Sequence, residues 1–267
     1  YIVNILLGKG YYVNVISRTA TLSSKDFTIY KPGQCKFINC DIKNFNKLES
    51  ELAGSDVVIN LVGLLFNKKN NSFIDVHKLA VKNIVSVCNK LKVKKLIHFS
   101  AIGADKRSKS EYAKTKFYGE EEVKKFHNYC ILRPSIIYGD EDNFINFFAQ
   151  TSKVAPFLPL IGGGDNLFQP IWVQDVANIT AGILESHTKQ KILEIGGEEV
   201  FTFKKILEII LEELQLKRKL VTVPYGVSKK LAFFLEILPT PVLTMDQVEM
   251  LKSDNIISKK YHYKKTL

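Results

Sequence analysis

The feature that most constrains this chain is the alternation of short apolar runs with amphipathic segments over its first half. Segments with helical spacing of apolar residues lie between most of these runs, at 1–7, 44–53, 73–91 and 110–126. The apolar runs have the length and β-branched content of buried strands, and they cover residues 11–16, 36–40, 56–60, 95–100 and 130–133. This alternation predicts an α/β fold, a doubly wound parallel sheet with helices on both faces.

The regular alternation stops near residue 140. Beyond it we expect helices at 144–150, 174–186 and 202–215, a short strand at 192–195, and a glycine-containing loop at 158–165. We therefore predict a larger domain over 1–140 to which 166–182 returns. A smaller C-terminal α+β lobe is expected over 141–165 and 183–267, laid over the strand ends where it would enclose a substrate.

Composition narrows the function classes. With 46% hydrophobic and 24% charged residues the chain is expected to be globular. The net charge of +11 leaves two interpretations open: solvated lysine-rich faces, or contact with an anionic phospholipid or acidic partner. No nucleic acid is expected, because the sequence contains no zinc-finger, helix-turn-helix or RNA-recognition signature. The four cysteines form no CxxC pair, so we expect no metal site and a reducing, cytoplasmic compartment.

In doubly wound sheets ligands bind at the carboxyl ends of the strands, so residues that follow strands are the first candidates. Tyr112 and Lys116 lie four apart on a predicted helix and share one face, and Ser100 ends the preceding strand. A nearby ammonium is expected to lower the pKa of the Tyr112 phenol and make it a general acid or base. We predict Ser100, Tyr112 and Lys116 as catalytic residues, with Lys116 also bonding a ribose hydroxyl.

A line of cofactor contacts is predicted at three other strand ends. Ser17-Arg18 follows a buried strand, and an arginine at that place favours the 2′-phosphate of NADP(H) over NAD(H). Asp41-Ile42 follows the next strand, where the carboxylate would accept a hydrogen bond from an adenine amino group. Asn60-Leu61-Val62-Gly63 follows the third, and Gly63 allows a close approach of the backbone to the cofactor.

Two further features have plain interpretations. His77 is a lone histidine on the predicted 73–91 helix, a place where packing or surface roles are commoner than catalysis. Gly162-Gly163-Gly164-Asp165 does not join a buried strand to a helix, so we interpret it as a connection within the lobe and not as a phosphate loop.

Together these residues resemble the extended and atypical short-chain dehydrogenase/reductases, over nearly the whole chain. The resemblance rests on Arg18, Asp41, Asn60–Gly63, Ser100, Tyr112/Lys116 and Arg133-Pro134-Ser135. It implies a Rossmann-like dinucleotide-binding domain. In that superfamily the segment matching Pro134-Ser135-Ile136 lines the nicotinamide end of the cofactor.

One branch is more similar still: the NAD(P)-binding accessory subunits of respiratory complex I and their bacterial relatives. The similarity lies in residues 133–142 with Phe144 and Asn146-Phe147, in 169–176, and in Val76-His77, where ordinary extended members often have Asn instead of the histidine. The branch implies a tightly held, largely structural NADP(H) and contact with hydrophilic-arm subunits of complex I. It also implies a peripheral position on the inner or cytoplasmic membrane.

Residues 224–242 form an apolar stretch with a basic pair that is too short to span a bilayer, so we expect it on a membrane, on a partner or in the lobe core.

An alternative function stays open. The chain would then be an active NADP-dependent oxidoreductase, or an NAD-dependent epimerase or dehydratase, acting on a sugar nucleotide or other small carbonyl compound. The chain starts at Tyr1 inside an apolar pattern. We expect the first strand and the glycine-rich loop to lie upstream, and the chain as it stands to bind the cofactor poorly.

Overall fold

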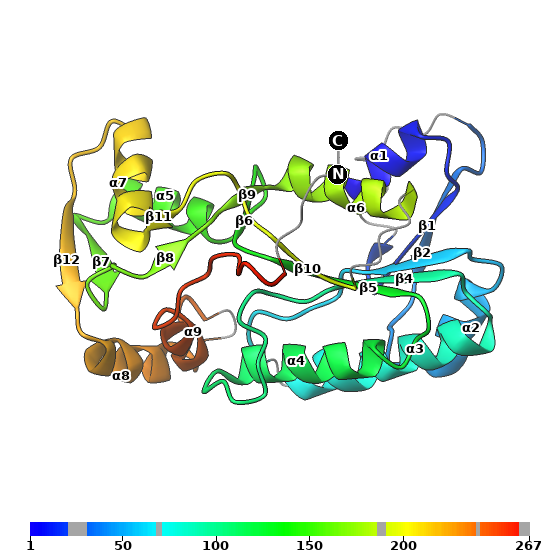
Figure 1. The fold of residues 1–267 in the computed structure, drawn as a ribbon. Helices are drawn as coiled ribbons and strands as arrows, with labels where there is room; N and C mark the ends of the chain where they lie inside the picture. Colours follow the sequence, from blue (N-terminus) through cyan, green and yellow to red (C-terminus); the bar gives the residue numbers. More distant parts are fainter. Residues whose placement is uncertain (21–30, 68–70, 186–190, 239–240, 262–267) are drawn as a thin grey trace.

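The computed structural model describes residues 1–20, 31–67, 71–185, 191–238 and 241–261. The chain forms two parts side by side: a sheet flanked by helices, and a smaller part built mostly from segments of the second half of the chain (Figure 1). Among the described residues, no helix has the length and hydropathy needed to cross a membrane.

The main sheet has four parallel strands. In spatial order they are β10 (Ile192–Ile195), β5 (Tyr129–Pro134), β4 (Lys95–Phe99) and β3 (Val57–Asn60). All four carboxyl ends lie at the same edge because every pair is parallel. This confirms the predicted α/β fold with a parallel sheet.

A second, separate sheet holds β1 (Val13–Ser17) and β2 (Cys35–Asn39), also parallel. Among the described residues no strand pairs with the other edge of β1 or with the outer edge of β3. The strands of the first half are therefore divided between two sheets, and the carboxyl ends of β1 and β2 lie at an edge of their own.

Helices cover both faces of the main sheet (Figure 1). On one face lie α2 (Phe45–Leu52), α3 (Ala80–Lys90) and α4 (Glu111–Val123), and on the other lie α1 (Ile2–Gly8) and α6 (Val173–Glu185). Alternate residues of each strand point to opposite faces, so Leu96 and Ile131 pack toward α3 and α4 while Ile97 and Leu132 pack toward α6. The helix predicted at 73–91 begins with one π-helical turn, η2 (Asp75–Leu79), before α3.

The smaller part is organised around a parallel pair, β7 (Phe157–Ile161) with β12 (Lys219–Val223). Helices α5 (Ile145–Val154) and α7 (Phe203–Glu213) pack on each other there through a core of phenylalanines, followed in the chain by α8 (Tyr225–Leu235) and α9 (Met245–Met250). Short ladders join β6 (Ile137–Tyr138) to β9 (Ile171–Trp172), and β8 (Leu167–Phe168) to β11 (Phe201–Thr202).

Two expectations differ from the structure. The segment 158–165 was expected to be a loop, but its first half belongs to β7, and only Gly162, Gly163 and Gly164 form the turn, all with positive φ. The strand at 192–195 lies in the range 183–267 assigned to the smaller lobe, yet β10 pairs with β5 in the main sheet. The boundary between the two parts therefore differs there, and the rest of the division stays a prediction.

Candidate functional site

The candidate site begins where β3 leaves the sheet. Asn60 is buried; its Oδ1 accepts a hydrogen bond from the Val62 amide at 3.1 Å, and its Nδ2 donates to His98 Nδ1 at 3.0 Å. These two bonds fix the turn over Leu61, Val62 and Gly63 against β4. The predicted Asn60–Gly63 segment therefore lies at the carboxyl edge of the main sheet, with Leu61 about half exposed.

Lys116 reaches this edge from α4. Its ammonium is buried and donates to the carbonyl oxygen of Phe99, the last residue of β4, at 3.1 Å. A Cβ added at Gly63 would lie 3.2 Å from Lys116 Nζ, so glycine permits this close approach. Burial lowers the pKa of Lys116 to about 8, with the Glu120 carboxylate acting in the opposite direction. Lys116, Gly63 and the end of β4 therefore meet, a contact between two predicted site residues that the sequence did not predict.

Tyr112 lies one turn earlier on α4 with its ring in an aromatic cluster. It meets His77 edge-on at 5.4 Å and Phe73 at 5.8 Å between ring centroids, and Lys116 Nζ is 5.8 Å from its centroid. Burial, and then the charge of Asp246, raise the pKa of Tyr112 to about 12. The sequence predicted a lowered pKa for Tyr112, and that prediction is wrong. The Lys116 ammonium is bonded to the Phe99 carbonyl and does not offset the desolvation of the Tyr112 phenol. In this arrangement Tyr112 is a phenol, a hydrogen-bond donor.

His77 ties the turn after β3 to α4. Its Nε2 accepts a hydrogen bond from the Leu64 amide at 3.0 Å, so the proton is assigned to Nδ1, which donates to Thr115 Oγ1 at 3.0 Å. Burial, and then the Lys116 charge, lower the pKa of His77 to about 3. The sequence favoured a packing or surface role, whereas the structure places His77 against Tyr112. A single histidine on a helix carries no signal that distinguishes the two.

Ser100 follows β4 at the same edge. Its amide donates to Leu132 O at 2.7 Å, whereas its buried hydroxyl oxygen has no hydrogen-bond partner among the described residues. A buried hydroxyl left without a partner is costly and calls for a ligand or water. The Ser100 hydroxyl and the Lys116 ammonium together fit the ribose and nicotinamide end of a dinucleotide, whereas the space at Gly63 is taken by Lys116 and His77.

The predicted adenosine end lies at the ends of β1 and β2. The Ser17 carbonyl accepts from the Cys40 amide at 2.8 Å, and Ser17 Oγ accepts from the Thr19 amide at 3.2 Å. Asp41 Oδ1 accepts from the Lys43 amide at 2.9 Å, which places the carboxylate and Ile42 beside this edge. Arg18 is exposed and forms no ion pair within the described residues. Its guanidinium is therefore accessible to a phosphate.

The Pro134-Ser135-Ile136 segment is covered by the C-terminal segment of residues 254–261, here called the strap. Ser135 Oγ is 2.8 Å from Asn255 O and 2.7 Å from Asn255 Oδ1, and it accepts from the Gln169 amide at 3.3 Å. The Ser135 hydroxyl is thus engaged by the strap in this structure.

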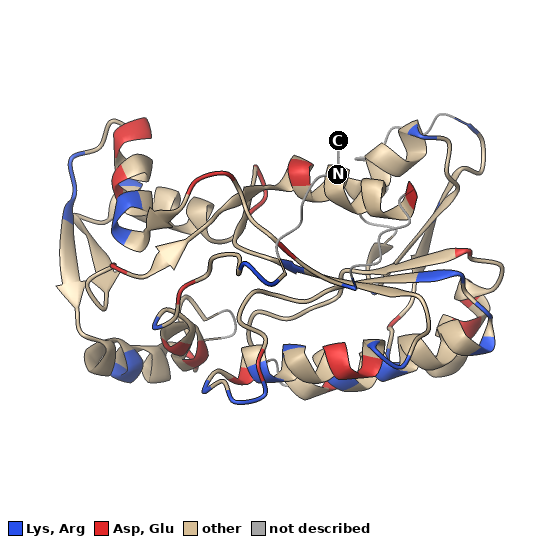
Figure 2. Cartoon of the chain, viewed as in Figure 1, with Lys and Arg blue, Asp and Glu red and all other residues tan. Residues whose placement is uncertain are grey.

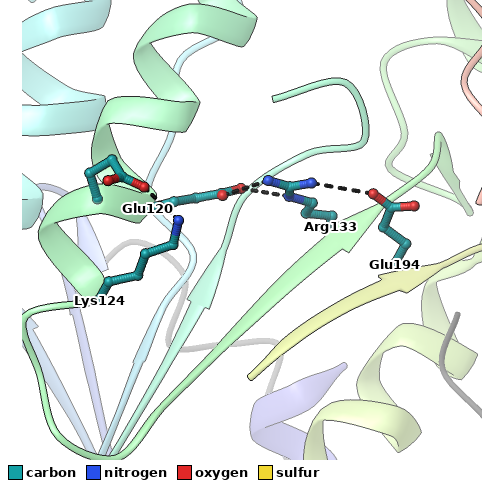
Figure 3. Close-up of polar contacts among 5 residues, drawn as sticks. Glu120, Lys124, Arg133 and Glu194 are labelled. Atoms are coloured by element: carbon teal, nitrogen blue, oxygen red, sulfur yellow. Dashed lines mark hydrogen bonds and ion pairs between the residues drawn. The ribbon is translucent and has the colours of Figure 1, made fainter. Parts of the chain in front are cut away.

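Arg133 stands at the centre of a buried ionic cluster (Figure 3). Its guanidinium donates two bonds to Glu120, at 2.8 and 2.7 Å, and one to Glu194 at 3.3 Å. The Tyr261 ring lies 5.2 Å from the guanidinium carbon. Glu120 is one helical turn after Lys116, so the cluster holds α4 against β5, β10 and the strap. Sequence reasoning identified neither carboxylate, since each pairs with Arg133 only in the folded chain.

The comparisons with known proteins agree with this geometry. A family model described as "NAD dependent epimerase/dehydratase family" matches residues 1–196. Among solved structures, the UDP-glucuronic acid 4-epimerase of Bacillus cereus with UDP-glucuronic acid and NAD superposes with a TM-score of 0.72 at 19% identity, covering 94% of this chain and 95% of that one. A dTDP-glucose 4,6-dehydratase from Streptomyces venezuelae with NAD bound gives a TM-score of 0.71 at 20% identity, covering 84% and 80%. At such identities these likenesses show the fold alone.

Curated relatives are more similar in sequence. The chain is 30% identical over 239 residues to the NADH dehydrogenase [ubiquinone] 1 alpha subcomplex subunit 9 of Arabidopsis thaliana, and 32% identical over 215 residues to that of Dictyostelium discoideum. It is 30% identical over 228 residues to the NADH-ubiquinone oxidoreductase 40 kDa subunit of Neurospora crassa. These matches cover 85%, 79% and 84% of this chain and 60% of each relative, so the chain spans about three fifths of their length.

Proposed function

Since the chain belongs to the NAD dependent epimerase/dehydratase family, we propose that it forms the nucleotide-binding body of an accessory subunit of a complex I-type NADH:quinone oxidoreductase. In this role NADP(H) is held largely as a structural group. The observation that carries the proposal is the arrangement of Tyr112 and Lys116: the phenol has a pKa of about 12 and stays protonated, and the ammonium is buried and donates to the Phe99 carbonyl. The groups present are set to hold a ligand, and relatives named as complex I subunits support the association.

A nicotinamide dinucleotide supplies hydride chemistry when it is bound, and the residues here would bind and orient it. Lys116 and Tyr112 would donate hydrogen bonds to ribose hydroxyls, and the Ser100 hydroxyl would gain the partner it lacks. The Asn60–Gly63 turn would lie along the cofactor, and the backbone at Pro134 and Ile136 would flank the nicotinamide. Asp41 would accept from the adenine amino group.

The preference for NADP(H) over NAD(H) rests on Arg18. Its exposed guanidinium follows β1 directly and suits the 2′-phosphate. Arg18→Glu should weaken NADPH binding much more than NADH binding in a fluorescence titration of the purified full-length protein. Lys36→Glu, which makes the same charge change at an exposed position of β2, serves as the control. Equal losses of both nucleotides in the Arg18 variant would remove Arg18 from the 2′-phosphate role.

Association with complex I is tested together with turnover. The native protein should co-fractionate with the hydrophilic arm of complex I, and Tyr112→Phe should leave that association intact. NADPH that co-purifies should not be oxidised by added carbonyl substrates. Turnover that Tyr112→Phe abolishes would overturn the structural role of the cofactor.

That outcome would instead support the second candidate, an active NADP-dependent oxidoreductase or an NAD-dependent epimerase or dehydratase on a sugar nucleotide or other small carbonyl compound. One observation favours it: Ser100, Tyr112 and Lys116 all lie at the carboxyl edge of the main sheet, where the unpartnered Ser100 hydroxyl would bond a substrate oxygen.

A peripheral contact with the inner face of the cytoplasmic membrane is proposed for residues 224–242. Only Ser228 and Ala232 of α8 are buried, whereas Phe234 is 66% and Ile237 78% exposed, so the segment is mostly surface and not lobe core. Residues 239–240 lie outside the described part. Lysines are spread over both parts of the molecule (Figure 2), but Lys229 and Lys230 lie directly beside this apolar surface. Apolar side chains flanked by lysines suit an anionic bilayer surface.

Vesicle sedimentation tests this contact. The native protein should pellet with phosphatidylcholine vesicles that contain phosphatidylglycerol and much less with pure phosphatidylcholine. Replacing Phe233 and Phe234 together by serine should abolish pelleting, whereas Tyr12→Ser, at an exposed aromatic in the other part, should not change it. Unchanged pelleting of the double variant would exclude α8 as the lipid contact.

A further inference from the structure

One carboxylate joins the smaller part of the molecule to the start of α4. Asp246, from α9, accepts hydrogen bonds from Ser110 Oγ at 2.8 Å, the Glu111 amide at 2.5 Å and the Tyr112 amide at 3.2 Å. Amides in the first turn of a helix have no partner within that helix. Ser110 caps α4 through the Ala113 amide, and Asp246 satisfies two of the remaining donors from 134 and 135 residues away.

Asp246 also belongs to the first turn of its own helix, α9. Thr244 and Gln247 close that turn with a capping box. The first turns of α4 and α9 therefore meet at this one carboxylate, whose negative charge is favourable at the start of α4.

The rest of α9 is fixed to α8. Lys229 forms an ion pair with Glu249, and Glu236 Oε1 accepts from the Met245 amide at 2.7 Å. A cavity of about 550 Å³ lies along the seam between this helix pair and the larger part, with Phe66, Phe73 and Glu111 on one side and Thr244 and Asp246 on the other. Asp246 thus lies in the wall of this cavity and bonds to α4, the helix that carries Tyr112.

We propose that Asp246 is the positioning residue of the Tyr112 site: it fixes the first turn of α4 and keeps Tyr112 as a phenol that binds a ligand instead of a phenolate that reacts. The inference rests on the proposed structural role of the cofactor and names the residue that enforces it. The sequence motifs at the strand ends do not include Asp246. It lies on α9, outside the main sheet, and acts on Tyr112 through α4.

Electrostatics around Tyr112 support this assignment. The groups that face it are Asp246 at the helix start, the Lys116 ammonium at 5.8 Å from the ring centroid, the neutral His77, and Glu111, which precedes it on α4. Burial is the larger cause of the raised Tyr112 pKa, and the Asp246 charge is the second. The Asp246 carboxylate therefore adds to burial in disfavouring the phenolate form of Tyr112.

The test uses Asp246→Asn, which keeps an oxygen acceptor for the α4 amides and removes the charge. Tyrosine labelled with ¹³C at Cζ reports each phenol by NMR, and Tyr112→Phe assigns the signal. In the cofactor-free protein the Tyr112 pKa should fall from about 12 toward the value near 10 of a free phenol. Asp254→Asn is the control, because Asp254 also accepts a backbone amide, that of Leu167 at 2.8 Å, in the same part of the molecule. An unchanged Tyr112 titration in Asp246→Asn would overturn the proposal.

Hydrogen exchange gives a second measurement on the folded protein. Asp246→Ala removes the acceptor as well, so exchange of the Glu111 and Tyr112 amides should accelerate by about tenfold, the equivalent of one net hydrogen bond. Exchange rates equal to those of the native protein would contradict the positioning role. Neither measurement needs complex I or NADPH. The proposed function is tested separately, by NADPH binding and by co-fractionation of the native protein. Failure of this inference is therefore distinguishable from failure of the proposed function.

Discussion

Lys116 governs the electrostatics of the site more directly than any other residue. Its ammonium is buried and, within the described residues, donates one hydrogen bond, to Phe99 O; its pKa is lowered to about 8. Burial of a charge without an ion-pair partner costs free energy that a bound ligand can recover. Lys116 therefore destabilises the ligand-free protein and favours binding of an acceptor.

The pH dependence of this cost has a definite sign. The folded pKa lies below the ordinary value of 10.5, so below about pH 8 both states are protonated and the cost is fully present. As the pH rises from 8 to 10.5 the folded state loses its proton first and the cost disappears. Lys116→Met should raise the Tm at pH 7 by several degrees, at roughly 2–4 °C per kcal/mol. The gain should shrink toward zero by pH 10.5.

Thermal melts at pH 7, 8, 9 and 10 measure this difference. Comparing the two proteins cancels the titration of other groups, and Lys114→Met on the same helix controls for loss of a lysine that is not fully buried. If the Tm gain of Lys116→Met grew as the pH rose, the assignment of a buried charge to Lys116 would be contradicted.

The ionic cluster at Arg133 predicts a larger effect. Glu120→Gln leaves the buried guanidinium with Glu194 alone, and breaking a buried pair in this way typically costs about 3–5 kcal/mol. Glu121→Gln, whose exposed carboxylate pairs with Lys124, should cost less than about 1 kcal/mol. Urea unfolding of the two variants checks the contrast. Equal midpoints would show that the Arg133 cluster does not stabilise the fold.

Prediction from sequence located the strand ends where the candidate site lies, and the roles assigned to the residues there stay predictions. Ser100 and Asn60 lie at the sheet edge because β4 and β3 end there and pair in parallel. Lys116 reaches the same edge from α4. Prediction from sequence failed for Asp246 and Glu194, whose contacts join segments far apart in the chain. The direction of the Tyr112 pKa was wrong for a related reason: the spacing to Lys116 is visible in sequence, but the burial of the ring is not.

At the scale of elements, most helices and strands lie within a few residues of their predicted places. β7 was missed, because Pro159 and the following glycines indicate a loop, and its partner β12 is about 60 residues away. The π-helical turn η2 was also not predicted, since its residues continue the same apolar spacing as α3. The η2 turn brings the carbonyl oxygen of His77 against Gly119 of α4.

Gly119 tests that helix contact. A Cβ added there would lie 2.2 Å from His77 O, a backbone atom that cannot swing aside. Gly119→Ala should therefore destabilise the protein by about 1–3 kcal/mol despite the better helix propensity of alanine. Gly182→Ala in α6, where the new Cβ meets nothing within 4 Å, should stabilise it by about 0.5–1 kcal/mol. A lower Tm for Gly119→Ala together with a higher Tm for Gly182→Ala would confirm the close contact. A higher Tm for both variants would exclude it.

At the scale of the whole molecule, the strap fastens the smaller part to the main sheet. The Asn255 amide donates to Leu167 O at 2.7 Å, and the Glu194 amide donates to Tyr261 O at 2.7 Å. Gln169 Oε1 and Glu194 Oε2 accept from the amides of Ile257 and Ser258, at 3.1 and 2.8 Å. The sequence pattern gave no strand or helix for these residues, so their role depends entirely on tertiary contacts.

Two truncations isolate the strap. A stop codon after Ser253 removes it, and the Glu194 and Gln169 amides, which donate to Tyr261 and Asn255, should then exchange with solvent much faster. A stop codon after Tyr261 keeps all of these contacts and should leave both exchange rates unchanged. Mass-spectrometric hydrogen exchange on peptides from β10 and β8 makes the comparison. Equal protection in both truncations would show that the strap does not fasten the two parts.

The position of β10 has a consequence for how the protein is made. Because β10 pairs with β5 across an interval of 57 residues between Pro134 and Ile192, the sheet cannot acquire its fourth strand until the ribosome has delivered residue 195. During that interval β5 presents an open edge, and β6, α5 and β7 emerge beside it. At the rates of about 5–20 residues per second typical of synthesis, the exposed edge persists for roughly 3–12 seconds. A nascent chain of this protein is therefore open to mispairing at β5 while residues 135–191 are being made.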